Sequence, residues 1–258
     1  MANIFPRWTN TLPLQVVVAL GVMGLGVSAA VSYYFTPKYT RVGYQPDQPV
    51  PYDHKLHVGQ LGMDCRYCHS FVEKSGHANI PAASTCWNCH QHVKLGSPKL
   101  EPIRKAVDKN YEGYDGKPVE WVRVHRAPDY VYFDHSAHVN RGVSCVSCHG
   151  DVGEMRVVHH AEAQSMSWCL DCHKNPEKHL RPLDEVFNLK WQPEDLSRED
   201  FTDYLAGKAD ADTVAELLPI PKNGKDDEPL SQEEIGSALK ELWKIHPPSP
   251  NNCSGCHR

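Results

Sequence analysis

The chain has 258 residues and a formal net charge of −5, with no basic run and no interleaving of basic and aromatic residues. This composition argues against nucleic acid as a partner. The 20 prolines, 17 glycines, 16 histidines and 10 cysteines predict extensive loops and a chain organised around bound groups rather than around long helices or sheets.

The first predicted element is a membrane-spanning helix at residues 12–35, which are uncharged and long enough to cross a bilayer. Trp8 precedes this segment and an aromatic run closes it at residues 33–35, as is common at membrane–water interfaces. A cleaved signal peptide is the alternative, because residues 27–29 resemble a cleavage site. The apolar run is longer than the core of most signal peptides. We therefore expect a retained anchor, preceded by a short N-terminal segment at residues 1–11.

Every cysteine belongs to one of five copies of the pattern Cys-x-x-Cys-His. This spacing is the attachment signature of c-type haem, in which two thiols bond the porphyrin and the next histidine binds the iron. The five motifs, numbered in chain order, are Cys65, Cys68 and His69; Cys86, Cys89 and His90; Cys145, Cys148 and His149; Cys169, Cys172 and His173; and Cys253, Cys256 and His257.

Two other kinds of site use cysteines in this number. Zinc sites of the Cys-x-x-Cys type use pairs of units and need no histidine after the second cysteine, whereas five units leave one unpaired. A disulfide framework also takes an even number of cysteines, but a two-residue spacer is poor for structural disulfides. The repeated histidine favours five covalently bound haem c groups. Because haem is attached covalently outside the cytoplasm, we expect the N-terminus in the cytoplasm and the haem-bearing part in the periplasm or outside the cell.

An internal repeat links the first four motifs. Tyr52-Asp-His54-Lys-Leu-His57 leads into the first motif, and Phe133-Asp-His135-Ser-Ala-His138 leads into the third. We predict a tetrahaem core at residues 36–182, built from two dihaem units at about residues 50–95 and 130–176, here called the first and second repeats. The fifth motif stands alone at residues 251–258.

The paired histidines of each repeat are the predicted distal ligands of the irons. His54 and His135 precede their motifs by a distance that lets them fold over the haem of that motif. His57 and His138 follow one helical turn later and are expected to reach neighbouring haems. The same His-x-x-His arrangement occurs in class III cytochromes.

The fifth distal ligand is predicted less sharply. His125, in an aromatic and apolar stretch, is the first candidate, and a thioether from Met155 or Met166 is the alternative. The two methionines could equally be ordinary core residues. The remaining histidines are expected not to bind iron: His77, His92, His159, His160, His179 and His246.

Residues 183–250 form an acidic, proline-punctuated segment that carries no motif. Two short helices are expected there, near residues 199–206 and 231–244. The segment either packs around the haem cluster or forms a docking arm for another protein, and docking is slightly favoured. The predicted fold is therefore mainly α with extensive loops and few strands: two class-III-like dihaem units and a C-terminal haem on a single N-terminal transmembrane helix.

Several segments together resemble the pentahaem cytochrome c subunit of alternative complex III, a quinol-oxidising respiratory complex. They are the N-terminal anchor, YDHKLHVGQLGMDCRYCH, RVHRAPDYVYFDHSAHV, SMSWCLDCHKNPE and the terminal CSGCHR. The resemblance covers the anchor, the haem core to about residue 182 and the last few residues, but not the acidic segment. It implies a chain that conducts electrons without catalysing a reaction alone, with one His/Met haem. It also implies partners: iron–sulfur and polytopic membrane subunits, and a mono-haem cytochrome, soluble carrier or terminal oxidase as acceptor.

Two rival functions differ in what they require of the irons. A quinol dehydrogenase of the small membrane-anchored type would oxidise quinol directly at a membrane-proximal haem. A multihaem reductase acting on nitrite or hydroxylamine would need an iron with a vacant position, often marked by lysine in place of the motif histidine. All five motifs here end in histidine, which argues against the reductase.

Overall fold

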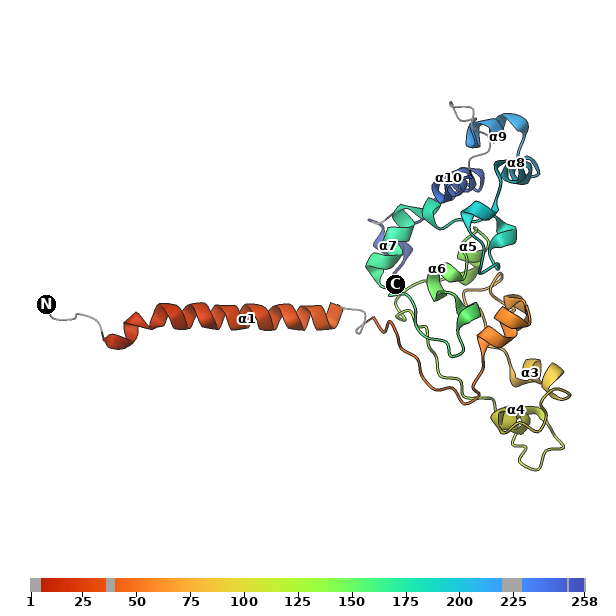
Figure 1. Cartoon of the computed structure of the whole chain (residues 1–258), viewed down its shortest axis with the longest axis horizontal. Helices are drawn as coiled ribbons and strands as arrows, with labels where there is room; N and C mark the ends of the chain where they lie inside the picture. Colours follow the sequence, from red (N-terminus) through yellow and green to blue (C-terminus); the bar gives the residue numbers. More distant parts are fainter. Residues whose placement is uncertain (1–5, 36–39, 220–228, 250, 258) are drawn as a thin grey trace. The chain divides into compact units, whose positions relative to one another are not determined.

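The computed structural model describes residues 6–35, 40–219, 229–249 and 251–257 (Figure 1). Residues 1–5 of the predicted cytoplasmic segment, residues 36–39 of the predicted tetrahaem core, residues 220–228 and 250 of the acidic segment, and Arg258 of the C-terminal segment lie outside the described residues. The chain forms two compact units, residues 1–43 and residues 44–258, which we call the anchor unit and the haem-binding unit.

The anchor unit consists of the helix α1 (Leu12–Phe35), which has the bounds expected from the sequence, preceded by the short 3-10 helix η1 (Arg7–Asn10). Its span Leu12–Tyr34 has a mean hydropathy of 2.1, and none of that window is buried. A helix that is apolar all round and has no protein core against it has the properties of a membrane span. The predicted helix is therefore confirmed, and it is consistent with a membrane anchor.

The haem-binding unit is built from short helices and long connections, so the predicted mainly α fold is confirmed. Its α-helices are α2 (Cys65–Cys68), α3 (Ala83–His90), α4 (Glu101–Val107), α5 (His135–Val139), α6 (Val146–His149), α7 (Met166–Lys174), α8 (Arg198–Ala206), α9 (Ala211–Leu217) and α10 (Gln232–Leu242). A π-helical turn, η2, spans Lys55–Gln60. Single 3-10 turns are η3 (Pro98–Leu100), η4 (Val152–Glu154), η5 (Pro176–Lys178), η6 (Leu183–Glu185), η7 (Pro193–Asp195) and η8 (Cys253–Gly255). Strand pairing within the described ranges is limited to two isolated bridges, Val131–His257 and Val143–Leu180.

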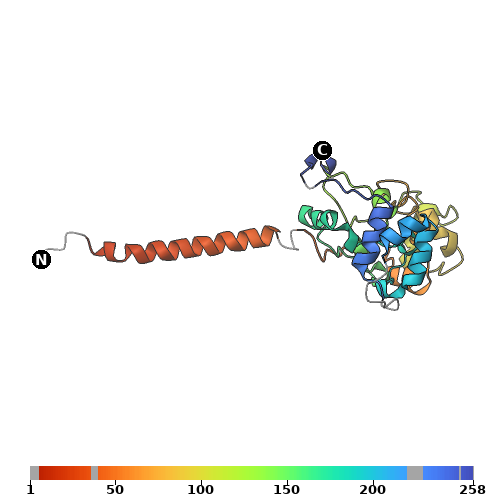
Figure 2. The same cartoon turned by 90° about the horizontal axis from the view of Figure 1, so that it is seen from above.

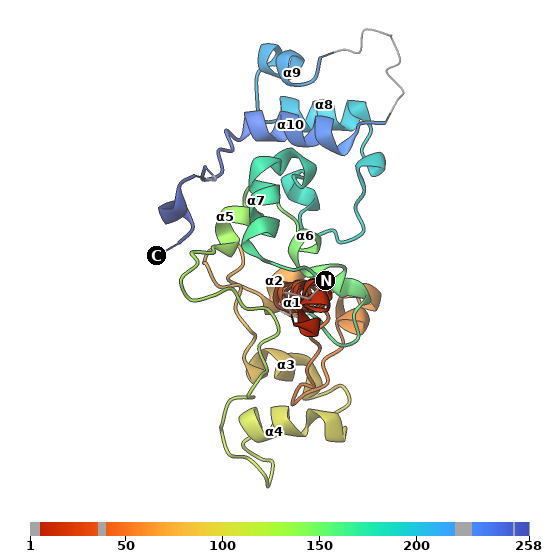
Figure 3. The same cartoon turned by 90° about the vertical axis from the view of Figure 1, so that its left-hand side faces the viewer.

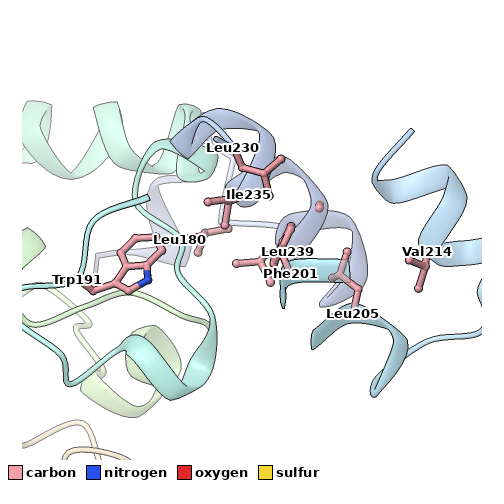
Figure 4. Packing of buried hydrophobic residues seen from close by; sticks show 9 residues of the cluster. Leu180, Trp191, Phe201, Leu205, Val214, Leu230, Ile235 and Leu239 are labelled. Carbon is pink, nitrogen blue, oxygen red and sulfur yellow. The ribbon is translucent and has the colours of Figure 1, made fainter. Parts of the chain in front are cut away.

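The largest apolar core lies in the acidic segment, where α8, α9 and α10 form a C-terminal helical module (Figure 4). Phe201 and Leu205 on α8 meet Ile235 and Leu239 on α10, and each pair is spaced by one helical turn. Helices predicted near residues 199–206 and 231–244 are thus confirmed as α8 and α10. Ser231 caps α10 through a reciprocal pair of hydrogen bonds with Glu234.

The module packs directly on the turn that follows the fourth motif. Gln232 Nε2 donates to the carbonyl oxygens of Glu177 (3.1 Å) and Leu180 (2.7 Å), and Lys240 pairs with the Glu177 carboxylate at 3.1 Å. Gly236 brings the backbone of α10 against the Glu177 carbonyl so closely that a Cβ atom there would lie 1.8 Å from its oxygen. The acidic segment therefore packs against the turn after the fourth motif, and its docking to another protein stays a prediction.

The elements of the haem-binding unit follow one another along its length. Figures 1 and 3 both place α3 and α4 at one end, the turn around α2 and the helices α5 and α6 in the middle, and α7 with the C-terminal helical module at the other end. The C-terminal segment that carries the fifth motif lies beside α7 in Figure 1 and again in the view from above in Figure 2. The motifs are thus distributed along the unit rather than gathered around one point.

The close approach at Gly236 gives a test of this packing. Gly236→Ala is expected to destabilise the haem-binding unit by about 1–3 kcal/mol, because a methyl group cannot fit against the Glu177 carbonyl without moving α10. The measurement is chemical denaturation followed by far-ultraviolet circular dichroism. Gly207→Ala is the matched control, since the nearest atoms to its added Cβ lie at an ordinary 3.6 Å. Equal stability of both variants would show that α10 does not dock as described.

Candidate haem-binding site

Each motif lies on a helical turn, which gathers its three functional side chains on one face. The cysteines are spaced i, i+3 and the histidine lies at i+4, the spacing that brings side chains together on a helix surface. The turn is closed in the backbone at the first, third and fifth motifs, where the histidine N–H donates to the carbonyl of the first cysteine at 2.8–2.9 Å. The second and fourth motifs lie at the C-terminal ends of α3 and α7.

Several of the candidate iron ligands are oriented by a hydrogen bond from ring atom Nδ1 to a backbone carbonyl. His69 donates to Asn79 O at 2.7 Å and His90 to Val93 O at 3.0 Å. Because the carbonyl can only accept, Nδ1 carries the proton, and Nε2 is left with a lone pair for a metal. This is the arrangement that a metal-binding imidazole needs.

The two repeats use the same device for the second histidine of each His-x-x-His pair. His57 donates from Nδ1 to Asp53 O at 2.8 Å, and His138 donates to Asp134 O at 2.7 Å. The same two aspartates also cap the turn, since the side chain of Asp53 accepts from Leu56 N and that of Asp134 accepts from Ser136 N. Asp53 and Asp134 were not predicted as site residues, although the Asp-His-x-x-His repeat contains the signal.

Three imidazole pairs face one another at a common separation. The ring centroids of His57 and His90 are 6.2 Å apart, those of His138 and His173 are 6.1 Å apart, and those of His135 and His149 are 6.3 Å apart. Two imidazoles that bind one metal from opposite sides, each at a nitrogen–metal distance of about 2 Å, have centroids about 6 Å apart. Each pair joins a motif histidine to a predicted distal histidine, so the residues present fit a haem iron between them.

The rings of His54, His125 and His149 are kept neutral by burial. Burial, with neighbouring histidines, lowers the pKa of His54 and of His125 to about 4 and that of His149 to about 3. After burial, the charge on His69 contributes most to lowering the pKa of His54, so His54 lies in the electrostatic neighbourhood of the first motif. Neutral imidazole is the form that binds metals, so these rings are ready as ligands at neutral pH.

His125 lies in a cluster of histidines around the third motif. Its ring centroid is 4.4 Å from that of His149 and 5.0 Å from that of His160. His160 was expected to be an ordinary histidine; it is only 3% exposed and stacks on His125. The separation of His125 from His149 is shorter than the spacing of two ligands across one metal, and nothing in the sequence pattern distinguished His160 from the other histidines.

An aromatic ring stands against both histidines of each repeat. Tyr52 meets His54 edge-on at 4.6 Å and stacks on His57 at 4.5 Å. Phe133 repeats this geometry, edge-on to His135 at 4.8 Å and stacked on His138 at 4.8 Å. These rings restrict the rotation of the imidazoles and so fix the planes in which they face a metal.

The two candidate methionines have different surroundings. Met155 is buried, with its methyl group against Gly150 directly after the third motif. Met166 is 61% exposed at the first position of α7, three residues before Cys169 on the same face of that helix.

The fifth motif is held by the segment just before the second repeat's paired histidines. Val131 pairs with His257 in a bridge, Tyr132 N donates to Cys256 O at 2.8 Å, and the Tyr130 ring lies 5.7 Å from that of His257.

Apolar side chains around the motifs are exposed to an unusual degree. They include Leu61, Tyr67, Phe71, Ile80, Val93, Leu95, Tyr130, Tyr132 and Phe133. Soluble proteins rarely leave so many large apolar residues exposed around one site unless something covers them. A porphyrin is a flat apolar group of the right kind, so this surface also fits covalently attached haem. Its thiol anchors are available, since all ten cysteines are free.

The motifs, the facing imidazoles and the apolar surface together define a c-type cytochrome. Residues 131–195 match the family model described as cytochrome c7 and related cytochrome c. The chain is also similar to the menaquinone reductase multihaem cytochrome c subunit of Nitratidesulfovibrio vulgaris, with 31% identity over 178 residues, covering 61% of this chain and 81% of that protein. The chain therefore belongs to the family of multihaem cytochromes c that includes this subunit.

Proposed function

We propose that this chain is a membrane-anchored pentahaem cytochrome c that conducts electrons for a quinol-linked membrane complex. The three imidazole pairs at 6.1–6.3 Å carry the proposal, because they join motif and distal histidines at the spacing of two ligands to one iron. A bound haem supplies an iron that takes up and gives back one electron with little change in its ligands when both axial positions are filled.

We assign four of the irons two histidines each. The proposed pairs are His69 with His54, His90 with His57, His149 with His135, and His173 with His138. Nδ1 hydrogen bonds to backbone carbonyls hold five of these rings: His57, His69, His90, His135 and His138. Tyr52 and Phe133 fix the planes of the two histidines of their own repeats. A reaction at a vacant iron position is not needed, so the chain alone is proposed to carry no catalysis.

For the fifth iron we propose His257 and Met166. The thiols of Cys169 and Cys256 are close enough to interact electrostatically, and Met166 lies one turn before Cys169 on the same face of α7. Met155, in contrast, is enclosed next to Gly150 and fits the apolar wall of the third site. His125 and His160 then serve as packing partners of His149 rather than as the fifth distal ligand.

The whole assembly is proposed from the sequence resemblance and from the name of the relative. We place the chain in a complex of the alternative complex III type, with residues 12–35 in the cytoplasmic membrane, the N-terminus in the cytoplasm and the haem-binding unit outside it. Iron–sulfur and polytopic subunits would exchange electrons with quinol, and a mono-haem cytochrome, a soluble carrier or a terminal oxidase would accept them. The apolar helix α1 supports the anchor.

The name of the relative favours a second possibility, in which electrons flow through the chain towards a quinone. The relative is the multihaem subunit of a menaquinone reductase, a name that describes delivery of electrons to a quinone. The same residues serve either direction, because an iron bound by two imidazoles can accept an electron as readily as it gives one up. Which direction operates is then a property of the partners and of the potentials, and the proposal of a conduit holds for both.

Ligand replacement tests the conduit. His57→Ala and His138→Ala are each expected to turn one of five low-spin ferric haems into a high-spin haem, because each removes one of two axial imidazoles. The measurement is electron paramagnetic resonance of the detergent-purified full chain, with total haem counted as the pyridine haemochrome. His92→Ala, an exposed histidine close to the second motif, is the control and should leave all five signals unchanged. A wild-type chain that already contains a high-spin haem able to bind nitrite would contradict the conduit.

The methionine assignment is tested by potentials. Met166→Ala is expected to lower the potential of the highest-potential haem, because thioether ligation favours ferrous iron. A visible redox titration measures it, and Met155→Ala is the matched control that should leave this potential in place. If Met155→Ala lowers the potential instead, Met155 is the ligand.

The complex and the direction of flow are tested on material purified from the native membrane. Iron–sulfur and polytopic subunits are expected to copurify, and the haems should be reduced by a menaquinol or ubiquinol analogue only when those subunits are present. Reduction of the isolated chain by the analogue would make this chain itself a quinol dehydrogenase. Oxidation of pre-reduced haems by added menaquinone in the complex would establish the reverse direction.

A further inference from the structure

We propose that the five haem sites form one unbranched series in the order second, first, third, fourth, fifth, so that the second and fifth sites are its two ends. This inference rests on the proposed function that every motif binds a haem, and it goes beyond it by fixing which sites are neighbours. The order differs from the order of the motifs along the chain.

The first and second sites are joined within the first repeat. The single turn that begins at His54 places its first histidine beside His69 and its second histidine 6.2 Å from His90. Across the two motif helices, the Asn88 side-chain amide donates to the Tyr67 hydroxyl at 3.2 Å. The thiols of Cys68 and Cys86 also interact electrostatically.

The third and fourth sites are joined in the same way within the second repeat. The helix α5 carries His135 and His138, whose rings lie 6.3 Å from His149 and 6.1 Å from His173. Gln164, just before α7, donates to the Cys148 carbonyl at 3.0 Å. Each repeat is thus a pair of sites bridged by one His-x-x-His turn.

The two repeats meet through their equivalent first members. His135, the first histidine of the second repeat, donates from Nδ1 to Gly76 O of the first repeat at 2.8 Å, and the thiols of Cys65 and Cys145, the first cysteine of each repeat, are close enough to shift each other's pKa. Backbone contacts are reciprocal: Lys55 N donates to Met155 O at 3.0 Å, and Ser136 N donates to Ser75 O at 3.3 Å.

These four backbone partners occupy matching positions in the repeats. Lys55 and Ser136 each follow the first histidine of their repeat, and Ser75 and Met155 stand at the same distance after Cys68 and Cys148. Reciprocal contacts between equivalent residues are the property of a two-fold, isologous interface. The first and third sites therefore face one another, and the second and fourth sites point away from the joint.

The ends of the series follow from what packs beside them. In the second motif, Cys86 and Trp87 pack on the buried Leu100 and Ile103 next to and within α4, at the end of the unit away from α7 (Figure 3). At the other end, the C-terminal segment that carries the fifth motif lies beside α7, which carries the fourth (Figures 1 and 2), and burial together with the nearby Cys256 thiol raises the pKa of Cys169. The second site thus has one neighbour, the first, and the fifth site also has one, the fourth.

Removal of single haems tests the order. The change of charge on one iron shifts the potential of its neighbours, and this effect falls with distance. In the proposed order, Cys65→Ala/Cys68→Ala, which removes the first haem, shifts the potentials of two remaining haems, whereas Cys86→Ala/Cys89→Ala, which removes the second, shifts one. If the haems followed the order of the motifs along the chain, removal of the first haem would shift one potential and removal of the second would shift two. The measurement is a redox titration of the detergent-solubilised full chain followed by electron paramagnetic resonance.

Controls separate this inference from the proposed function. Cys253→Ala/Cys256→Ala removes the fifth haem and should shift one potential, and the pyridine haemochrome should show five haems in the wild type and four in each variant. Fewer than five in the wild type contradicts the proposed function and not the order. Where a variant that lacks a haem does not accumulate, His54→Met and His57→Met keep the haem but raise its potential. His54→Met should shift the potentials of two neighbouring haems, and His57→Met should shift the potential of one. The reverse pattern overturns the order.

Discussion

The hydrogen bond from a histidine Nδ1 to a backbone carbonyl is the interaction on which the haem-binding unit depends. It recurs at His57, His69, His90, His135 and His138, with distances between 2.7 and 3.0 Å. Each such bond fixes the tautomer and the direction of one imidazole, so that Nε2 is presented to a metal. The short helices and tight turns are the means by which the chain brings a carbonyl to each ring.

The ordinary apolar core lies away from the motifs. Around the motifs the helices are four to nine residues long and leave large apolar side chains exposed. A continuous core of fully buried side chains occurs instead in the C-terminal helical module, which the motifs do not enter. This division is expected if porphyrin faces provide the apolar packing of the motif region. The module then has a mechanical task, because α10 holds Glu177 and Leu180 just after the fourth motif.

Local patterns were the part of the fold that the sequence could predict. The length and polarity of residues 12–35 predict an apolar helix whether the segment is a retained anchor or a signal peptide, and α1 has the predicted bounds. The two short helices expected near residues 199–206 and 231–244 are likewise present as α8 and α10. The facing of His57 to His90 and of His138 to His173 agrees with the expectation that the second histidine of each pair reaches a neighbouring site, but their binding to iron stays a prediction.

Contacts between distant segments were not predictable in this way. The placing of His125 and His160 beside His149 depends on how three connections fold over one another, and no periodicity encodes it. The contact of Cys65 with Cys145 has the same origin. The carbonyls of Asp53 and Asp134 receive the histidine rings, and a backbone acceptor does not depend on residue identity. Only the capping by their side chains is visible in the sequence, as the repeated Asp-His-x-x-His pattern.

The duplicated sequence and the proposed order of sites explain one another. Two copies of a dihaem unit can associate stably in a closed pair only if the same surface is used by both, and the reciprocal contacts of Lys55 with Met155 and Ser136 with Ser75 are of that kind. Such a joint occupies the faces of the first and third sites and leaves the second and fourth sites outward. The fifth motif and the C-terminal helical module are then additions to the second repeat, with no counterpart on the first. They break the symmetry of the pair, and they give the two ends of the proposed series different surfaces.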